Sequence, residues 1–209
     1  MNTCTNRYSQ PMARPLDHAK RAELLAAVVR YIADHGLADL SLRPLAAELG
    51  TSSRMLIYYF TTKEELLVQA LATQRPDIAA FFADIGDASE LRDRLWDFWT
   101  ANTSGEGRTS VRVMLQVLGA ACAPQSPYAD YAISAIAVFV SALADGLRNV
   151  PSIEDPEVAA TLLVSGLRGI LQDRMITGEV ERTDRAARRL IEQTVRIDAA
   201  NARAAGWWR

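Results

Sequence analysis

The strongest constraint on this chain lies in residues 42–60, which read LRPLAAELGTSSRMLIYYF. Ala46 is small enough for a second helix to cross close above it. Gly50 can adopt the left-handed conformation that a sharp turn between two helices requires. Leu56 can then anchor the second helix onto the first, beside Leu45 and Leu49. The spacing therefore predicts a helix-turn-helix, although an ordinary helical hairpin has similar apolar spacing.

The polar residues of this run favour the first interpretation over the hairpin. Ser52, Ser53 and Arg54 begin the second helix, where side chains can meet base edges in a major groove. Hydroxyl groups and helix N-termini suit phosphate oxygens. Lys63 stands in the first turn of the next helix, where a cation opposes the helix dipole. We interpret Lys63 as a phosphate ligand, the alternative being a solvated lysine neutralised by neighbouring glutamates.

The rest of the chain predicts an all-α protein. Apolar periodicity and Gly or Pro punctuation indicate a first helix from about residue 17 to Gly36, one from Ser41 to Gly50, a short one over 52–59 and one opened by Thr62. Further helices are expected over 76–86, 88–102, 107–122, 127–148, 155–177 and 183–204.

Charge is distributed unevenly along the sequence. Residues 1–63 hold eight Lys and Arg against five Asp and Glu, whereas the whole chain has a net charge of -2. A basic N-terminal segment on an acidic remainder indicates a polyanion as partner of the first segment.

Residues 17–71 resemble the DNA-binding domain of the TetR family of bacterial regulators. The matching pieces are Asp34-His35-Gly36, Leu42–Leu49, Gly50-Thr51-Ser52, Leu56, and Tyr58-Tyr59-Phe60 leading to Lys63-Glu64-Glu65-Leu66. Position 57, usually Tyr in the family, is Ile here, and position 54, often small, is Arg. The resemblance implies an N-terminal three-helix DNA-binding domain followed by a helical domain for ligand binding and dimerisation. It also implies a set of residues facing DNA: Arg43, Thr51, Ser52, Ser53, Arg54, Met55, Tyr58, Tyr59 and Lys63.

This organisation gives a flexible arm at 1–16, a DNA-binding domain at 17–62 and an effector-binding and dimerisation domain at 63–209. We expect a cytoplasmic repressor that binds a palindromic operator in double-stranded DNA as a homodimer and is released by a small molecule. The last two helices are the expected dimer interface, because the family dimerises through them and both carry apolar stripes. The alternative is that these stripes are internal core. The interface residues expected are Leu163, Gly166, Ile170, Leu190, Ile191, Thr194 and Ile197.

Aromatic residues and methionines between these two regions could line a mostly apolar effector pocket. The candidates are Trp96, Trp99, Met114, Leu118, Tyr131 and Phe139. Ser134, Ser141, Gln116 and Arg112 could orient a ligand, while core packing is the alternative for each candidate.

Other classes of function have little support in the sequence. His18 and His35 are the only histidines, and no Cys–His pair, HExxH, Walker loop or zinc spacing occurs. We therefore expect no catalytic residue, no metal site and no cofactor. The apolar segment 132–144 is too short to span a bilayer, so no membrane partner is expected. The remaining alternative is a non-catalytic helical adaptor for proteins, with a vestigial helix-turn-helix.

Overall fold

The structure, a computed structural model, describes residues 17–37, 40–73, 77–151 and 153–195. These residues form helices and no strand, as the sequence predicts. The arm at 1–16 lies outside the described residues. The helices are α1 (His18–His35), α2 (Leu42–Glu48), α3 (Ser53–Phe60), α4 (Lys63–Thr73), α5 (Ile78–Phe81), α6 (Ala88–Thr103), α7 (Gly105–Ala121), α8 (Ala129–Leu147), α9 (Pro156–Thr177) and α10 (Val180–Thr194).

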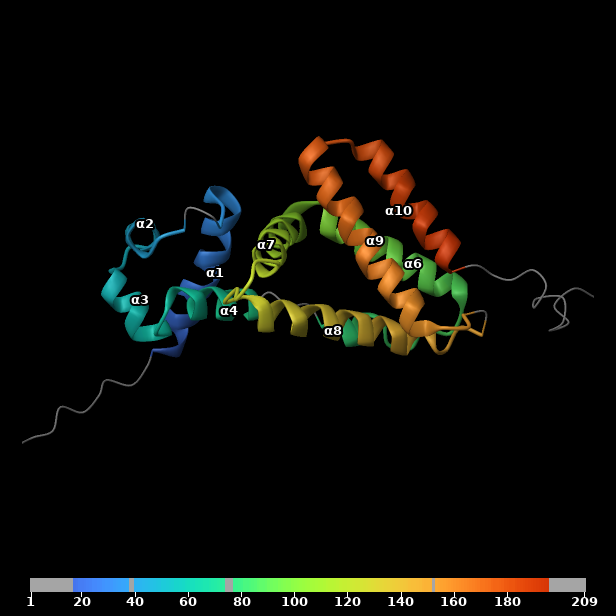
Figure 1. The fold of residues 1–209 in the computed structure, drawn as a ribbon, viewed down its shortest axis with the longest axis horizontal. Helices are drawn as coiled ribbons and strands as arrows, with labels where there is room; N and C mark the ends of the chain where they lie inside the picture. Colours follow the sequence, from blue (N-terminus) through green and yellow to red (C-terminus); the bar gives the residue numbers. More distant parts are fainter. Residues whose placement is uncertain (1–16, 38–39, 74–76, 152, 196–209) are drawn as a thin grey trace, which may run out of the picture.

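The first four helices form an N-terminal head, residues 17–73, at one end of the elongated molecule (Figure 1). Helix α1 begins at the cap Asp17, whose carboxylate accepts a hydrogen bond from Lys20 N at 3.0 Å. It packs its apolar face on α4, and α2 and α3 close the cluster. Leu66, Leu67 and other residues of α4 are fully buried in this cluster. The core of the head therefore extends through α4, past the expected domain boundary at residue 62.

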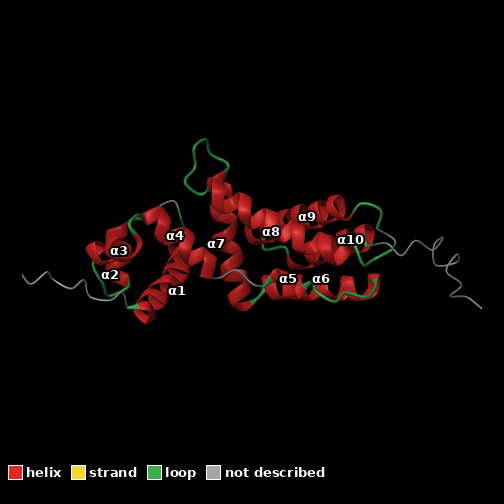
Figure 2. Cartoon of the chain, turned by 90° about the horizontal axis from the view of Figure 1, so that it is seen from below, coloured by secondary structure: helices red, strands yellow, loops and turns green. Residues whose placement is uncertain are grey.

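The remaining helices form a body, residues 77–195, in which α9 lies between α8 and α10 (Figures 1 and 2). A polar network joins three of its helices where α9 ends and α10 begins. Trp99 on α6 donates its indole N–H to Asp184 on α10 at 2.7 Å. Arg174 on α9 forms an ion pair with the same carboxylate at 2.5 Å. The network therefore links three helices that are far apart in the sequence.

Two expected helices differ from the observed ones. The helix predicted over 76–86 is only Ile78–Phe81, because Asp84 has φ 56, a conformation that a helix does not continue through. The helix predicted over 183–204 begins earlier, at Val180, and ends at Thr194. Residues 196–209, with the expected interface residue Ile197, lie outside the described part.

Helix α8 runs over Ala129–Leu147. It is longer than the apolar segment 132–144, which by itself is too short to span a bilayer. In length and composition it could cross a membrane, the one helix in the described residues of which this is true, and 28% of its apolar stretch is buried. One such helix is weak evidence for a membrane span. Here it packs against α9 and contributes Phe139 and Leu143 to a cavity in the body.

Candidate functional site

The turn between α2 and α3 is closed by backbone hydrogen bonds around Gly50. Gly50 N donates to Ala47 O at 3.2 Å, and Thr51 N donates to Ala46 O at 2.9 Å. This pair of bonds is the Schellman arrangement, which requires a left-handed residue after the helix. Gly50 supplies it with φ 61. The conformation predicted for this glycine is therefore confirmed.

Helix α3 is held by its inner face and presents its outer face to solvent. Leu56 and Phe60 are 0% and 1% exposed, against Leu45 and Ala46 of α2. On the outer side Met55 is 39% exposed and Tyr58 is 55% exposed. Arg54 is exposed on the same helix, as is Arg43 on α2. The helix therefore offers a long, uncovered surface carrying a cation, a thioether and a phenol.

The two serines at the start of α3 have structural hydrogen bonds of their own. Ser52 is the helix cap, because its hydroxyl accepts a bond from Met55 N at 3.2 Å. Ser53 donates its hydroxyl to Leu42 O at 3.3 Å, joining α3 to α2. Both hydroxyl groups thus take part in positioning the helix, and Arg54 is the exposed cation of its first turn.

Lys63 lies at the start of α4, where Thr62 caps the helix by accepting a bond from Glu65 N at 3.0 Å. The Lys63 ammonium donates to Leu40 O at 3.3 Å and is 3.8 Å from the nearest Glu64 carboxylate oxygen. Both the backbone and Glu64 therefore hold this cation near the foot of α3. Thr51 and Tyr59 are half-buried nearby.

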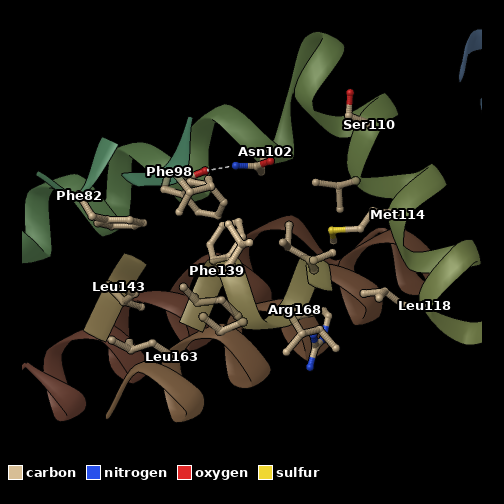
Figure 3. Close-up of a pocket in the computed structure, with 18 of the residues that line it drawn as sticks. Phe82, Phe98, Asn102, Ser110, Met114, Leu118, Phe139, Leu143, Leu163 and Arg168 are labelled. Atoms are coloured by element: carbon tan, nitrogen blue, oxygen red, sulfur yellow. Dashed lines mark hydrogen bonds between the residues drawn. The ribbon is translucent and has the colours of Figure 1, made fainter. Parts of the chain in front are cut away.

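An apolar cavity of about 170 Å³ lies in the body, between α6 and α7 on one side and α8 and α9 on the other (Figure 3). Phe98 and Phe139 meet edge to face across it, with ring centroids 5.2 Å apart. The volume exceeds that of an engineered cavity, about 150 Å³, that accepts benzene. The cavity can therefore receive the apolar part of a small molecule.

Four of the expected lining residues line this cavity and two do not. Met114, Leu118, Tyr131 and Phe139 face it. Trp99 is only 1% exposed, packed in the core with its indole N–H bonded to Asp184, and Trp96 lies under the guanidinium of Arg188 at 3.8 Å. Helix α6 instead turns Leu95, Phe98 and Asn102 toward the cavity, at helical spacing.

The polar residues around the cavity also differ from those expected. Ser134 and Ser141 are exposed on the outside of α8, while Gln116 and Arg112 contact the head. The cavity is lined instead by Asn102, Ser110 and Arg168. Arg168 follows a long apolar run on α9, and a charge in such a run was the signal that could have identified it.

Helix α7 connects this cavity to the head. Val113 and Val117 are fully buried in the head core, whereas Met114 and Leu118, one residue along, line the cavity. Gln116 accepts a hydrogen bond from Leu37 N at 2.7 Å, just beyond the end of α1. A displacement of α7 by an occupant of the cavity would therefore act directly on α1.

A second contact between head and body occurs at the start of α8. Tyr128 packs in the head core, and its burial, aided by the Glu64 carboxylate, raises the pKa of its phenol. Leu71 of α4 reaches the wall of the cavity.

The residues expected at a dimer interface lie mostly inside the single chain. Leu163 and Ile191 are 0% and 3% exposed in the body core. Leu190 packs over Gly166, where an added Cβ would lie 2.5 Å from a leucine methyl group. Ile170 and Thr194 are half-buried. The apolar stripes of α9 and α10 thus pack on each other within the chain. The exposed side of α9 carries other residues.

Comparison with known proteins agrees with this arrangement. Residues 24–70 match the family described as bacterial regulatory proteins, tetR family. No curated protein matches the sequence. Among solved structures, a transcriptional regulator from Rhodococcus sp. Rha1 is 21% identical, with a TM-score of 0.71 over 84% of this chain and 95% of that one. SmeT of Stenotrophomonas maltophilia in complex with triclosan is 19% identical, with a TM-score of 0.69 over 85% and 90%. The multidrug binding protein EbrR complexed with proflavin is 24% identical, with a TM-score of 0.55 over 82% and 99%.

Proposed function

We propose that this chain, a TetR-family protein by its residues 24–70 and by its fold, is a cytoplasmic DNA-binding transcription repressor that a small molecule releases from its operator. The observation that carries the proposal is the outward face of α3. Leu56 and Phe60 fix the helix from inside, and Arg54 and Tyr58 remain exposed. A short helix held in this way can enter a major groove with its N-terminal turn.

The contacts divide by chemistry. In this proposal Arg54 and Met55, on the first turn of α3, meet base edges, because arginine suits guanine. Arg43, Thr51, Tyr58, Tyr59 and Lys63 surround them and suit phosphate oxygens. Ser52 and Ser53 act mainly by positioning α3 through their own hydrogen bonds.

Selection of bound duplexes from a random DNA pool tests this function. A repressor of this kind enriches one inverted repeat, and its affinity falls steeply with salt because phosphate contacts release counterions. The adaptor alternative predicts no enriched sequence. Recovery of unrelated sequences at every salt concentration would refute the proposal.

Two heads on one operator require a dimer, and α9 offers a suitable surface. The outer side of α9 carries an exposed stripe of residues that are spaced symmetrically in the sequence on either side of Leu167. The stripe is Val158, Leu162, Ser165, Gly169, Gln172 and Ile176. Two antiparallel copies of α9 crossing at Leu167 would set Val158 of one copy against Ile176 of the other, and small residues would meet at the centre. Such self-complementarity is what a two-fold interface needs.

The dimer is tested by the mass of the protein in solution. Leu162 is 56% exposed, so Leu162→Glu should fold normally yet place a charge in the contact and weaken dimerisation at least about tenfold. Ile133→Glu on α8, at a side chain 66% exposed, is the control and should remain dimeric. Light scattering after size-exclusion chromatography measures both. A dimeric Leu162→Glu variant would exclude this face.

The effector acts, in this proposal, by favouring a body conformation in which α7 moves the head. Because operator half-sites have a fixed spacing of about 34–36 Å, a small change in head position reduces affinity. Triclosan and proflavin bound to SmeT and EbrR support a ligand role for the same fold. Compounds that release the selected operator would identify the effector, and equal operator affinity with and without saturating ligand would disprove the switch.

A further inference from the structure

We propose that the ligand of the body cavity is an amphipathic anion, with an apolar part among the phenylalanines and one carboxylate or similar group on Arg168. The inference rests on the proposed effector role of the cavity and names the class of effector. It follows from the one charged side chain among the described residues that line the cavity.

Arg168 lies on α9, and in Figure 3 it stands on the opposite side of the cavity from Asn102 and Ser110. Its guanidinium has five N–H donors. Within the part of the chain that the structure describes, it donates one long hydrogen bond, 3.4 Å, from Nη2 to the exposed hydroxyl of Ser165 on the same helix. No carboxylate of that part comes within 4.0 Å of it, in contrast to Arg94, Arg174 and Arg182, which have such partners.

Arg168 is half-buried at the rim of the cavity, and the cavity surface beside it is almost entirely hydrocarbon. Leu167 and Leu171 flank it on α9, and Val164 lies one turn before it. At this rim the guanidinium can meet the anionic group of a ligand whose apolar part lies among the hydrocarbon walls of the cavity. A carboxylate could accept two parallel bonds from the guanidinium, which adds orientation to attraction.

The composition of the lining also decides against a cationic ligand. Among the described lining residues there is no Asp or Glu, so a buried ammonium would find no compensating charge. Asn102 already donates its amide to Phe98 O at 2.7 Å. The polar groups thus provide one cation and neutral hydrogen-bonding groups, and their complement is a ligand with one anionic end.

Matched acids and amides test this inference. The probes are 4-phenylbutanoate with 4-phenylbutanamide, and octanoate with octanamide, each titrated calorimetrically into the full chain at neutral pH. Within each pair shape is almost unchanged and only the charge differs. We expect the acid to bind about tenfold more tightly than its amide. A hydrogen bond to a charged partner is stronger than one to a neutral partner, and the difference in free energy corresponds to about this change in affinity.

Three variants assign the preference to its residue. Arg168→Met keeps the length of the side chain and should abolish the preference for the acid, leaving amide binding unchanged. Arg168→Lys should keep part of it. Arg185→Met, at an exposed position of α10, removes the same net charge and should leave the preference intact. Circular dichroism of each variant establishes that it is folded.

Equal binding of acid and amide overturns the inference, as does a preference that survives Arg168→Met or the absence of binding by both acids. Operator binding without ligand is measured separately. If the ligand-free protein bound no operator, the proposed regulator function would be refuted, while the acid preference would still stand. The two failures can therefore be told apart.

Discussion

Replacing Gly50 by alanine isolates the conformational cost of the turn on which α3 depends. Gly50 has φ 61, and a Cβ built there meets no atom within 4 Å. The cost is therefore backbone strain without a clash. A left-handed L-residue costs about 1–2 kcal/mol, and the stiffer unfolded chain returns about 0.4–1 kcal/mol. We expect Gly50→Ala to lower the free energy of unfolding by about 1 kcal/mol, and Gly50→Asn by less, because asparagine tolerates this conformation.

Gly119 provides the matched control for this substitution. It lies in α7, with a helical backbone and no atom within 4 Å of an added Cβ. There alanine replaces a poor helix former, so Gly119→Ala should raise the free energy of unfolding by about 0.5–1 kcal/mol. Urea unfolding followed by circular dichroism measures both variants. If the two substitutions shifted the unfolding midpoint in the same direction, the role assigned to the turn at Gly50 would be refuted.

Three further predictions concern the head. Arg54→Ala should cost about 1–3 kcal/mol at one base pair and relax its sequence preference, whereas Lys63→Ala should weaken all sequences alike and reduce the salt slope by about one unit; operator titrations at several salt concentrations separate the two. Burial raises the pKa of Tyr128 in the folded state, so the stability that the neutral phenol contributes is complete below the usual tyrosine pKa and is lost as pH rises above that value. Tyr128→Phe should therefore flatten the decline of the unfolding free energy at alkaline pH. Thr61 has φ 63 and ψ -55, strained for a β-branched residue, so Thr61→Gly should raise the thermal unfolding midpoint, and a lower midpoint would contradict the strain.

The helix-turn-helix could be predicted because its determinants are local. Ala46, Gly50 and Leu56 act within one short segment, and each role follows from side-chain size or backbone freedom alone. Thr62 likewise caps α4 as expected. Thr62 and Glu65, three residues apart, have the sequence of a capping box, in which the glutamate would accept a bond from Thr62 N. That bond does not form, because Thr62 N donates to Phe60 O and Glu65 accepts from Gln69. The γ-turn at Thr61 thus takes the donor that the capping box would have used.

The lining of the cavity could be predicted only in part, because the orientation of α6 about its axis depends on distant helices. Trp96, Phe98 and Trp99 are all bulky and apolar, so their sequence does not distinguish the side facing the cavity. Asp184 on α10 makes the difference: its carboxylate accepts the indole N–H of Trp99. That contact turns Trp99 toward α10 and leaves Phe98 for the cavity. A pairing over so long a stretch of chain has no local signature.

In the proposed regulator, effector binding and operator binding meet at helix α7, and the two sides of this helix explain why. Val113 and Val117 are four residues apart, as are Met114 and Leu118, so each pair forms a stripe on its own side of the helix. One stripe belongs to the head core and the other to the cavity wall. A ligand that pushes Met114 outward must either compress the head core or move it, and close-packed cores resist compression. Movement of α1 is therefore the less costly response, and the hydrogen bond from Leu37 N to Gln116 ties α7 to the end of α1 at this point.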